Sequence, residues 1–141
     1  MKTFTVHEED FELVEAAKEK ISALYEEGKH HVGAALRTKS GEIISAVHLE
    51  ANVGRAAVCA EAIAIGCAIS NGQKDFQTIV AVRHPHRDEA NQDVRVVSPC
   101  GICRELISDY APDCFVLLES NGQLTKTTIA VLIPFKYTRQ E

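Results

Sequence analysis

The sequence predicts an α/β fold in which helices cover both faces of one sheet. Segments with helical spacing of apolar residues alternate along the chain with short runs of β-branched and aliphatic residues. Such an alternation predicts a three-layer α/β architecture, because each sheet face must be covered by helices. With 141 residues, 45% of them hydrophobic, the chain is long enough to bury one core. We therefore expect a single domain over residues 1–141.

The first half of the chain is expected to form a helix, a hairpin and a second helix. Thr5 with Glu8 predicts a capping box, after which apolar residues recur at helical spacing until Gly28. The hairpin turns at Gly41, a glycine that can adopt positive φ. The run that begins at Cys59 is nearly all apolar, which favours a helix buried on most sides. The two strands of the hairpin are expected at residues 32–38 and 42–49.

The second half is expected to contain three more strands and two more helices. A polar loop at residues 84–93 precedes a short apolar run at 94–97. Pro99 fits the first turn of a helix that must stop before Pro112. Asn121-Gly122 predicts a tight turn between two strands. The strands are expected at residues 78–82, 114–119 and 124–127, and a last short helix at 129–132.

Charge and composition exclude several classes of partner. The formal net charge of -5 leaves no basic footprint for phosphates, so we expect no nucleic-acid polymer as ligand. The N-terminus lacks an apolar leader and no stretch approaches membrane-spanning length, so we expect a cytoplasmic protein without membrane contact. The five cysteines include a Cys-x-x-Cys pair, which in a reducing compartment favours metal binding over disulfides.

Two short cysteine motifs indicate a metal site with hydrolytic chemistry. They are Cys59-Ala60-Glu61 and Pro99-Cys100-Gly101-Ile102-Cys103, each at the start of an expected helix. Three thiolates can hold one zinc ion and leave its fourth position to water. We expect Cys59, Cys100 and Cys103 to be the metal ligands. Glu61 is then the catalytic carboxylate, close to the metal without binding it.

The alternative is a structural zinc site that a fourth protein ligand closes. Cys67 lies two turns along the helix from Cys59, roughly 12 Å at 1.5 Å per residue, which is too far to share one metal. We expect Cys67 and Cys114 to be buried core thiols. His84 or His86 could supply the fourth ligand, although histidines in a polar loop are more often solvated.

With these residues the chain resembles the cytidine deaminase superfamily along its whole length. The resemblance implies a five-stranded mixed sheet with helices on both faces, one zinc per subunit and a homotetramer. It also implies hydrolytic deamination of a cytosine ring, in which Glu61 moves the protons. The matching segments are Val32-Gly33-Ala34-Ala35-Leu36, Gly41, Glu50, Cys59-Ala60-Glu61 and Ser98-Pro99-Cys100-Gly101-Ile102-Cys103-Arg104.

Three departures from the usual superfamily pattern concern the substrate and the cysteine cluster. His30-His31 stands where Phe-Pro is typical, and His48-Leu49-Glu50-Ala51 replaces the ribose-reading Asn-x-Glu-Asn. Ala62 replaces an arginine that compensates the thiolate charge. We expect Arg104 to take over this compensation, since a guanidinium can donate to a thiolate.

The resemblance is closer still to the members that detoxify the aminonucleoside antibiotic blasticidin S. The sugar of blasticidin S carries a carboxylate and few hydroxyls, for which histidine and arginine are better partners than an amide. The rivals are a cytidine or deoxycytidine deaminase of pyrimidine salvage and a non-catalytic zinc module used for binding. The resemblance implies that the residues contacting this small-molecule substrate are His48, Glu50, Ala60, Arg95, Ser98 and Tyr137.

Overall fold

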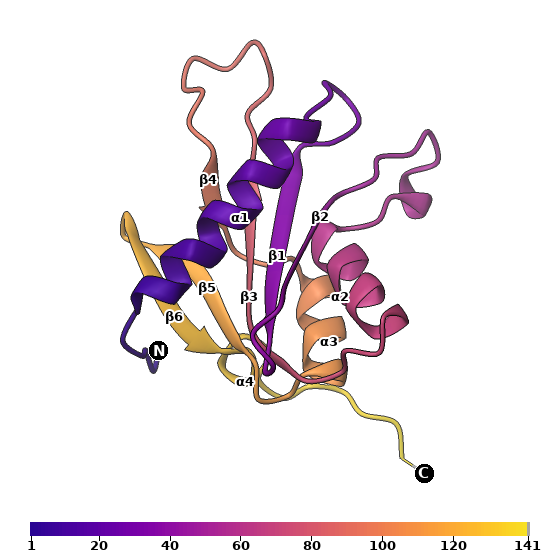
Figure 1. Cartoon of the computed structure of the whole chain (residues 1–141). Helices are drawn as coiled ribbons and strands as arrows, with labels where there is room; N and C mark the ends of the chain where they lie inside the picture. The colour runs from indigo at the N-terminus through magenta and orange to yellow at the C-terminus, as the bar shows by residue number, and fades with distance from the viewer. Residues whose placement is uncertain (141) are drawn as a thin grey trace.

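The computed structural model describes residues 1–140, which form helices and strands in the expected order (Figure 1). One additional strand forms on the apolar run at residues 94–97, and a short 3-10 helix precedes the second long helix. The elements are α1 (Glu8–Leu24), β1 (Val32–Thr38), β2 (Ile43–Val47), η1 (Gly54–Ala56), α2 (Ala60–Ser70), β3 (Phe76–Arg83), β4 (Arg95–Val97), α3 (Gly101–Tyr110), β5 (Phe115–Ser120), β6 (Gln123–Thr128) and α4 (Ile129–Leu132).

The sheet is mixed, and five strands follow one another in the order β2-β1-β3-β5-β6. β3 and β5 pair in parallel, whereas the other neighbours along this path pair antiparallel. The expected five-stranded mixed sheet is therefore confirmed along its main path. β4 is a sixth strand. It pairs antiparallel with the last residues of β3, which lie beyond the residues of β3 that pair with β5.

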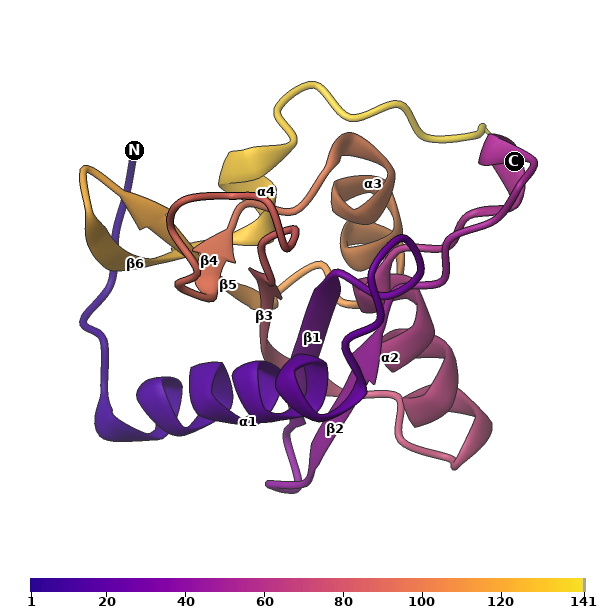
Figure 2. The same cartoon turned by 90° about the horizontal axis from the view of Figure 1, so that it is seen from above.

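Helices cover both faces of this sheet, which gives three layers (Figure 2). Side chains alternate between the faces along each central strand, so these strands are buried on both sides. On β1, Ala35 packs in the core under α1, and Leu36 packs in the core formed with α2 and α3. On β3, Val80 likewise packs in the core under α1, and Ile79 packs in the core formed with α2 and α3.

Gly33 lets α1 lie directly against β1. A Cβ atom at this position would lie 2.7 Å from the carbonyl oxygen of Ala17 and 2.9 Å from Cβ of Ile21. Neither contact can be relieved cheaply, because both neighbours belong to the packed helix. The glycine is therefore required by close packing rather than by an unusual backbone angle.

The ends of α1 and α3 differ in detail from the sequence expectations. α1 is capped two residues later than expected: the backbone N–H of His7 donates to the Asp10 carboxylate at 2.9 Å, so the box is not formed by Thr5 and Glu8. The same Asp10 oxygen accepts from Lys126, which gives it two partners. Pro99 lies just before the N-cap Cys100 rather than inside the first turn.

Cys67 corrects another expectation, since it is exposed rather than buried. The buried face of α2 carries Ala60, Glu61, Ala64, Ile65 and Ala68, and Cys67 lies outside it. An apolar helix on the outer layer of a sheet still has a solvent side, which the composition of the run could not reveal. Cys114, by contrast, is buried as expected, and its burial raises the pKa of the thiol to about 12.

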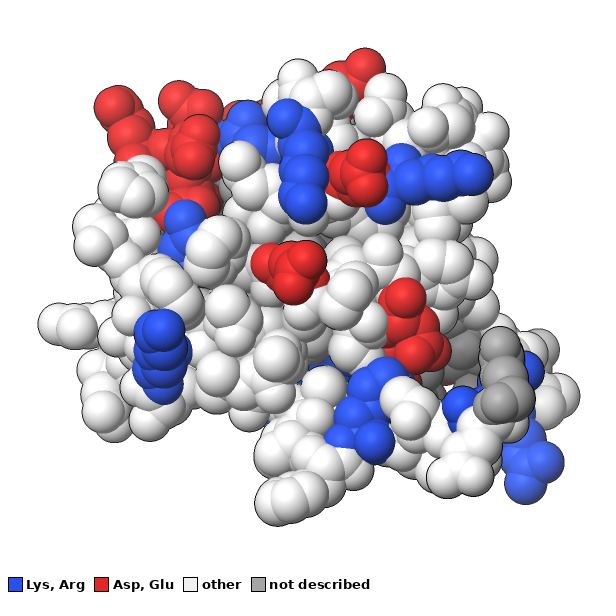
Figure 3. All heavy atoms as spheres, turned by 90° about the horizontal axis from the view of Figure 1, so that it is seen from below, with Lys and Arg blue, Asp and Glu red and all other residues white. Residues whose placement is uncertain are grey.

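None of the helices among the described residues is long and apolar enough to cross a membrane. The face shown in Figure 3 carries Lys and Arg interspersed with Asp, Glu and uncharged side chains. This mixture agrees with the modest negative net charge of the chain.

Candidate active site

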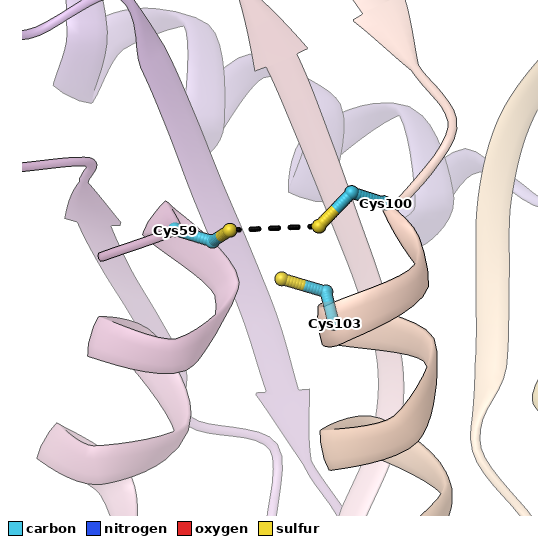
Figure 4. A group of neighbouring side chains, drawn as sticks. All are labelled: Cys59, Cys100 and Cys103. Atoms are coloured by element: carbon cyan, nitrogen blue, oxygen red, sulfur yellow. Dashed lines mark hydrogen bonds between the residues drawn. The ribbon is translucent and has the colours of Figure 1, made fainter. Parts of the chain in front are cut away.

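Three cysteine side chains converge where two helices begin (Figure 4). Cys59 is the N-cap of α2, Cys100 is the N-cap of α3, and Cys103 lies in the first turn of α3. The sulfurs of Cys59 and Cys100 are 3.5 Å apart, and all three Sγ atoms lie within 4.8 Å of one another. The two motifs that are separate in the sequence thus form one cluster.

The start of α3 favours the thiolate form of Cys100. The first N–H groups of a helix have no intrahelical partner, and the helix dipole places partial positive charge at this end. Burial alone would raise the pKa of Cys100, but hydrogen bonds from the backbone of Cys103 and Ile102 and from Cys59 hold it below its usual value. Burial raises the pKa of Cys59, and burial with the nearby Glu61 charge raises that of Cys103.

The cluster fits a zinc ion. Thiolate sulfur is a preferred zinc ligand, and three sulfurs at these separations can surround one tetrahedral ion. Because two of the thiols hold their protons without metal, binding must release protons, as is usual for cysteine sites. His84 and His86, considered above as closing ligands, do not join this group of three cysteines. A site with three protein ligands retains an open position, which is the arrangement of catalytic zinc.

Glu61 lies beside the cluster without belonging to it. Its side chain is 5% exposed and sits in the first turn of α2. Burial raises the pKa of its carboxyl, while a backbone N–H and the Cys103 thiol act in the opposite direction. A buried carboxylate that is held close to a metal and is not one of its ligands is placed to exchange protons with a reacting molecule.

A cavity of about 320 Å³ opens over Cys59, Cys100 and Glu61. This volume suits a small molecule rather than a polymer. Three of the expected substrate residues, His48, Ala60 and Ser98, line it. The apolar wall of the cavity was not predicted from the sequence. The only signal that could have indicated it was proximity to the cysteine motifs, as for Ile102, which lies between Cys100 and Cys103. These apolar residues are Val32, Ala57, Val58, Val97 and Ile102, and Gly54 completes the lining.

His48 is held in one tautomer at the wall of the cavity. Its Nδ1 accepts hydrogen bonds from the backbone N–H groups of His31 and Val32, at 2.9 and 3.1 Å. In the neutral ring the proton is therefore on Nε2, which faces the Glu50 carboxylate at 3.8 Å. Burial lowers the pKa of His48, against the opposing effect of Glu50. His48 thus presents an N–H donor, where the family pattern has an amide.

Arg104 makes no hydrogen bond to the three thiols, so its compensation of the thiolate charge stays a prediction. Its guanidinium donates to the carbonyl oxygens of Pro99 and Leu132 and to the hydroxyl of Ser98, at 2.9, 3.0 and 2.9 Å. These bonds brace the segment that leads into Cys100. The arginine therefore holds the loop before Cys100, while the helix starts provide the N–H groups nearest to the thiols.

The remaining expected substrate residues lie outside the cavity lining within one chain. Glu50 is at its border, exposed and next to His48. Arg95 lies on β4 in a different hollow, with Lys18 and Glu119. Tyr137 lies in the C-terminal tail, 78% exposed, with α3 residues such as Asp109 around the same hollow. One chain thus brings together His48, Ala60 and Ser98, but not Arg95 or Tyr137.

Comparisons with known proteins agree with this geometry. The family model for the cytidine and deoxycytidylate deaminase zinc-binding region matches residues 7–119. The chain is 73% identical over 139 residues to Blasticidin-S deaminase from Bacillus cereus, covering 99% of both chains. It is 30% identical to Cytidine deaminase from Halalkalibacterium halodurans, covering 92% of this chain and 93% of the relative.

A solved structure gives the same result at the level of the fold. The crystal structure of cytidine deaminase from Burkholderia pseudomallei superposes with a TM-score of 0.73 and 27% identity, covering 94% of this chain and 100% of that chain. Fold, cysteine cluster and family match thus converge, and the chain belongs to the cytidine and deoxycytidylate deaminase family.

Proposed function

We propose that this chain is a zinc-dependent aminohydrolase that removes the amine of the cytosine ring of blasticidin S and thereby inactivates the antibiotic. The observation that carries the proposal is the cluster of three cysteines beside the buried, non-ligand Glu61, at the floor of a small cavity. The substrate is supported by the 73% identity to Blasticidin-S deaminase from Bacillus cereus.

The reaction replaces nitrogen by oxygen at C4 of the ring. A C4–O bond forms with water, the C4–N bond breaks, one proton of the water ends on N3 and the other leaves with ammonia. A zinc ion held by Cys59, Cys100 and Cys103 supplies Lewis-acid activation of the water. The Glu61 carboxylate accepts a first proton from this water and gives it to N3; it then accepts the remaining proton from the new C4 hydroxyl and gives it to the departing amine.

The other cavity residues position the substrate for these transfers. Apolar side chains such as Val32 and Val97 exclude water from the faces of the ring. Ser98, which Arg104 holds through its hydroxyl, and the backbone of Ala60 line the cavity next to the cysteines. The His48 Nε2–H points to the border where Glu50 lies, so it can donate to an anionic group of the substrate.

We further propose that the enzyme is a cytoplasmic homotetramer whose subunits complete one another's cavities. Ile102 lines the cavity and is 74% exposed, and Val53, directly before the lining residue Gly54, is also exposed. Phe135 and Tyr137 expose their rings in the tail. Apolar groups of this kind favour burial against a second copy, which can also bring Tyr137 or Arg95 to a neighbouring cavity. The unpaired cysteines suit a reducing compartment.

The test is an assay of purified, zinc-loaded protein with blasticidin S, in which ammonia release and the deaminated product are measured together. Stoichiometric ammonia and a product carrying oxygen at C4 support the proposal. Zinc binding without ammonia release from blasticidin S or cytidine would instead identify a non-catalytic zinc module. Sedimentation of the active protein tests the assembly, and a fully active monomer would contradict the tetramer.

The second candidate is a cytidine deaminase of pyrimidine salvage. It is favoured by relatives named Cytidine deaminase at 28% and 30% identity, which span more than nine-tenths of this chain. The His48-Leu49-Glu50-Ala51 segment argues against it, because it lacks the asparagines of the family's ribose-reading pattern.

A further inference from the structure

A second group of metal-binding side chains lies apart from the cysteines and takes no part in the proposed reaction. It consists of Glu27, His31 and His86. Glu27 lies in the α1–β1 connection, His31 directly before β1, and His86 in the β3–β4 loop. Figure 1 shows the α1–β1 connection and the β3–β4 loop extending from the same end of the sheet. Residues distant in the sequence thus meet at one point.

We propose that Glu27, His31 and His86 form a second metal site, which binds a divalent transition metal such as zinc or cobalt. One ligand atom from each residue lies within 4.8 Å of the other two. Oε2 of Glu27 is 2.6 Å from Nδ1 of His86 and 3.9 Å from Nε2 of His31. The rings of His31 and His86 are 4.0 Å apart between centroids. Two imidazoles and one carboxylate are a donor set that suits such ions.

The hydrogen bonds around the three residues hold them as metal ligands are usually held. Oε1 of Glu27 accepts from the hydroxyl of Tyr25 and from the backbone N–H of Arg87, which leaves Oε2 turned toward the histidines. Nδ1 of His31 faces the carbonyl oxygen of His84 at 3.4 Å. A carbonyl or carboxylate partner on the second ring nitrogen is the usual means of orienting a ligating histidine.

The tautomer of His31 places a lone pair on Nε2, which a metal can use by displacing one hydrogen bond. Its Nε2 accepts a hydrogen bond from the backbone N–H of Gly28 at 2.9 Å, so this nitrogen carries a lone pair rather than a proton. The metal takes the place of that N–H. It also enters between Glu27 and His86, whose present contact is shorter than the separation of two ligands on one ion. His86 can move to allow this, because its side chain is 45% exposed on a loop.

The metal would join the segment before β1 to the β3–β4 loop, so its binding should stabilise the fold. A ligand that binds only the native state stabilises it by RT ln(1 + [L]/Kd). Neither segment supplies a cysteine ligand, so the two metal sites can be filled and emptied independently.

The experiment uses the full chain with the cysteine site first filled by one equivalent of zinc. Cobalt(II) is then added, and bound metal, the visible spectrum and the melting temperature are measured. We expect one further metal ion per chain, with ligand-field bands of a nitrogen and oxygen site, no thiolate-to-cobalt charge transfer, and a rise in melting temperature. His86→Gln should abolish all three changes while keeping the zinc at the cysteines.

Two further variants make the result specific. His84→Gln is the matched control, because His84 lies close by, stacked on Tyr25, but is not one of the three proposed ligands. The His84→Gln chain should bind two metal ions. Glu27→Gln should bind only one. A wild-type chain that binds one metal ion, or a folded His86→Gln chain that still binds two, would overturn the proposal. A wild-type chain that binds two metal ions but has no deaminase activity would contradict the proposed function and still support the second metal site.

Discussion

The two ends of the cavity are built by different means. At the cysteine end, the functional groups come from two helix starts, and each motif spans five residues or fewer. At the histidine end, His48 lines the cavity and is held by the backbone N–H groups of His31 and Val32. Outside the lining, the ring of His31 lies against Tyr25 and His86, which come from separate segments. Reaction chemistry is thus encoded locally, whereas the environment of the substrate's far end depends on tertiary contacts.

The largest effect is expected at the cysteine end. Cys103→Ser should lose zinc and activity together, because the buried Cys103 is one of the three proposed ligands, and it should lower stability, because the metal would link α2 to α3. Cys67→Ala is the matched control, since Cys67 is exposed outside the cluster. Metal analysis and ammonia release measure both effects. Stoichiometric zinc loss in Cys67→Ala would break the assigned ligand set.

Glu61→Gln should separate chemistry from metal binding at the same end. The variant should keep zinc and fold but lose at least about 10²- to 10⁴-fold in kcat, the usual range for general acid-base catalysis, because an amide cannot exchange these protons. Steady-state ammonia release, with zinc content as a second readout, measures this. Glu42→Gln, at an exposed position, is the control. Wild-type turnover in Glu61→Gln would remove this residue from the mechanism.

A smaller and selective effect is expected at the histidine end. In His48→Asn, the amide oxygen can accept the two backbone N–H groups that Nδ1 now accepts, but the shorter amide NH2 cannot reach the position that the Nε2–H donor occupies. A hydrogen bond to a charged group is worth ~1.5–3 kcal/mol, so the preference for blasticidin S over cytidine should fall about 10-fold or more. Ratios of kcat/KM for the two substrates measure it, and His7→Asn, on the N-cap of α1, should leave them unchanged. An unaltered ratio in His48→Asn would place substrate selection elsewhere.

The smallest effect concerns the acid stability of the histidine end. Hydrogen bonds from Tyr25, His86 and the Arg87 backbone lower the pKa of Glu27 from 4.5 to about 2. The ionised carboxylate therefore contributes stability that is complete above pH 4.5 and is lost as the pH falls toward 2. Glu27→Gln should be less stable than the wild type at neutral pH, and this difference should shrink across that window. Urea unfolding at several pH values measures it; a difference that does not change with pH would contradict this origin.

The sequence predicted most of what depends on neighbouring residues in the chain. Helical spacing and turn residues located nearly every element, and Asn121 and Gly122 do adopt the positive φ angles of a tight hairpin turn. Cys59 and Cys100 both proved to be N-caps, as expected for residues at helix starts. The cysteine cluster followed, because helices on the same face of a sheet can bring their starts together.

The sequence could not predict features in which a side chain has several possible partners or orientations. Arg104 follows Cys103 directly, yet its donors reach carbonyl oxygens and Ser98, because these groups lie where its side chain extends. Cys67 belongs to an apolar run, but only the packing of α2 decides which side of the helix faces solvent. Likewise, nothing in the spacing of Glu27, His31 and His86 indicates that they meet.

We propose that the cysteine end performs cytosine deamination while the histidine end selects a substrate other than cytidine. The most direct test measures kcat/KM of the zinc-loaded wild-type protein for blasticidin S and for cytidine side by side. A site that lacks hydrogen-bond partners for ribose hydroxyls discriminates against cytidine, because buried polar groups then remain unpaired. We predict a higher kcat/KM for blasticidin S. Efficient turnover of cytidine with no detectable action on blasticidin S would contradict the account and support the salvage function.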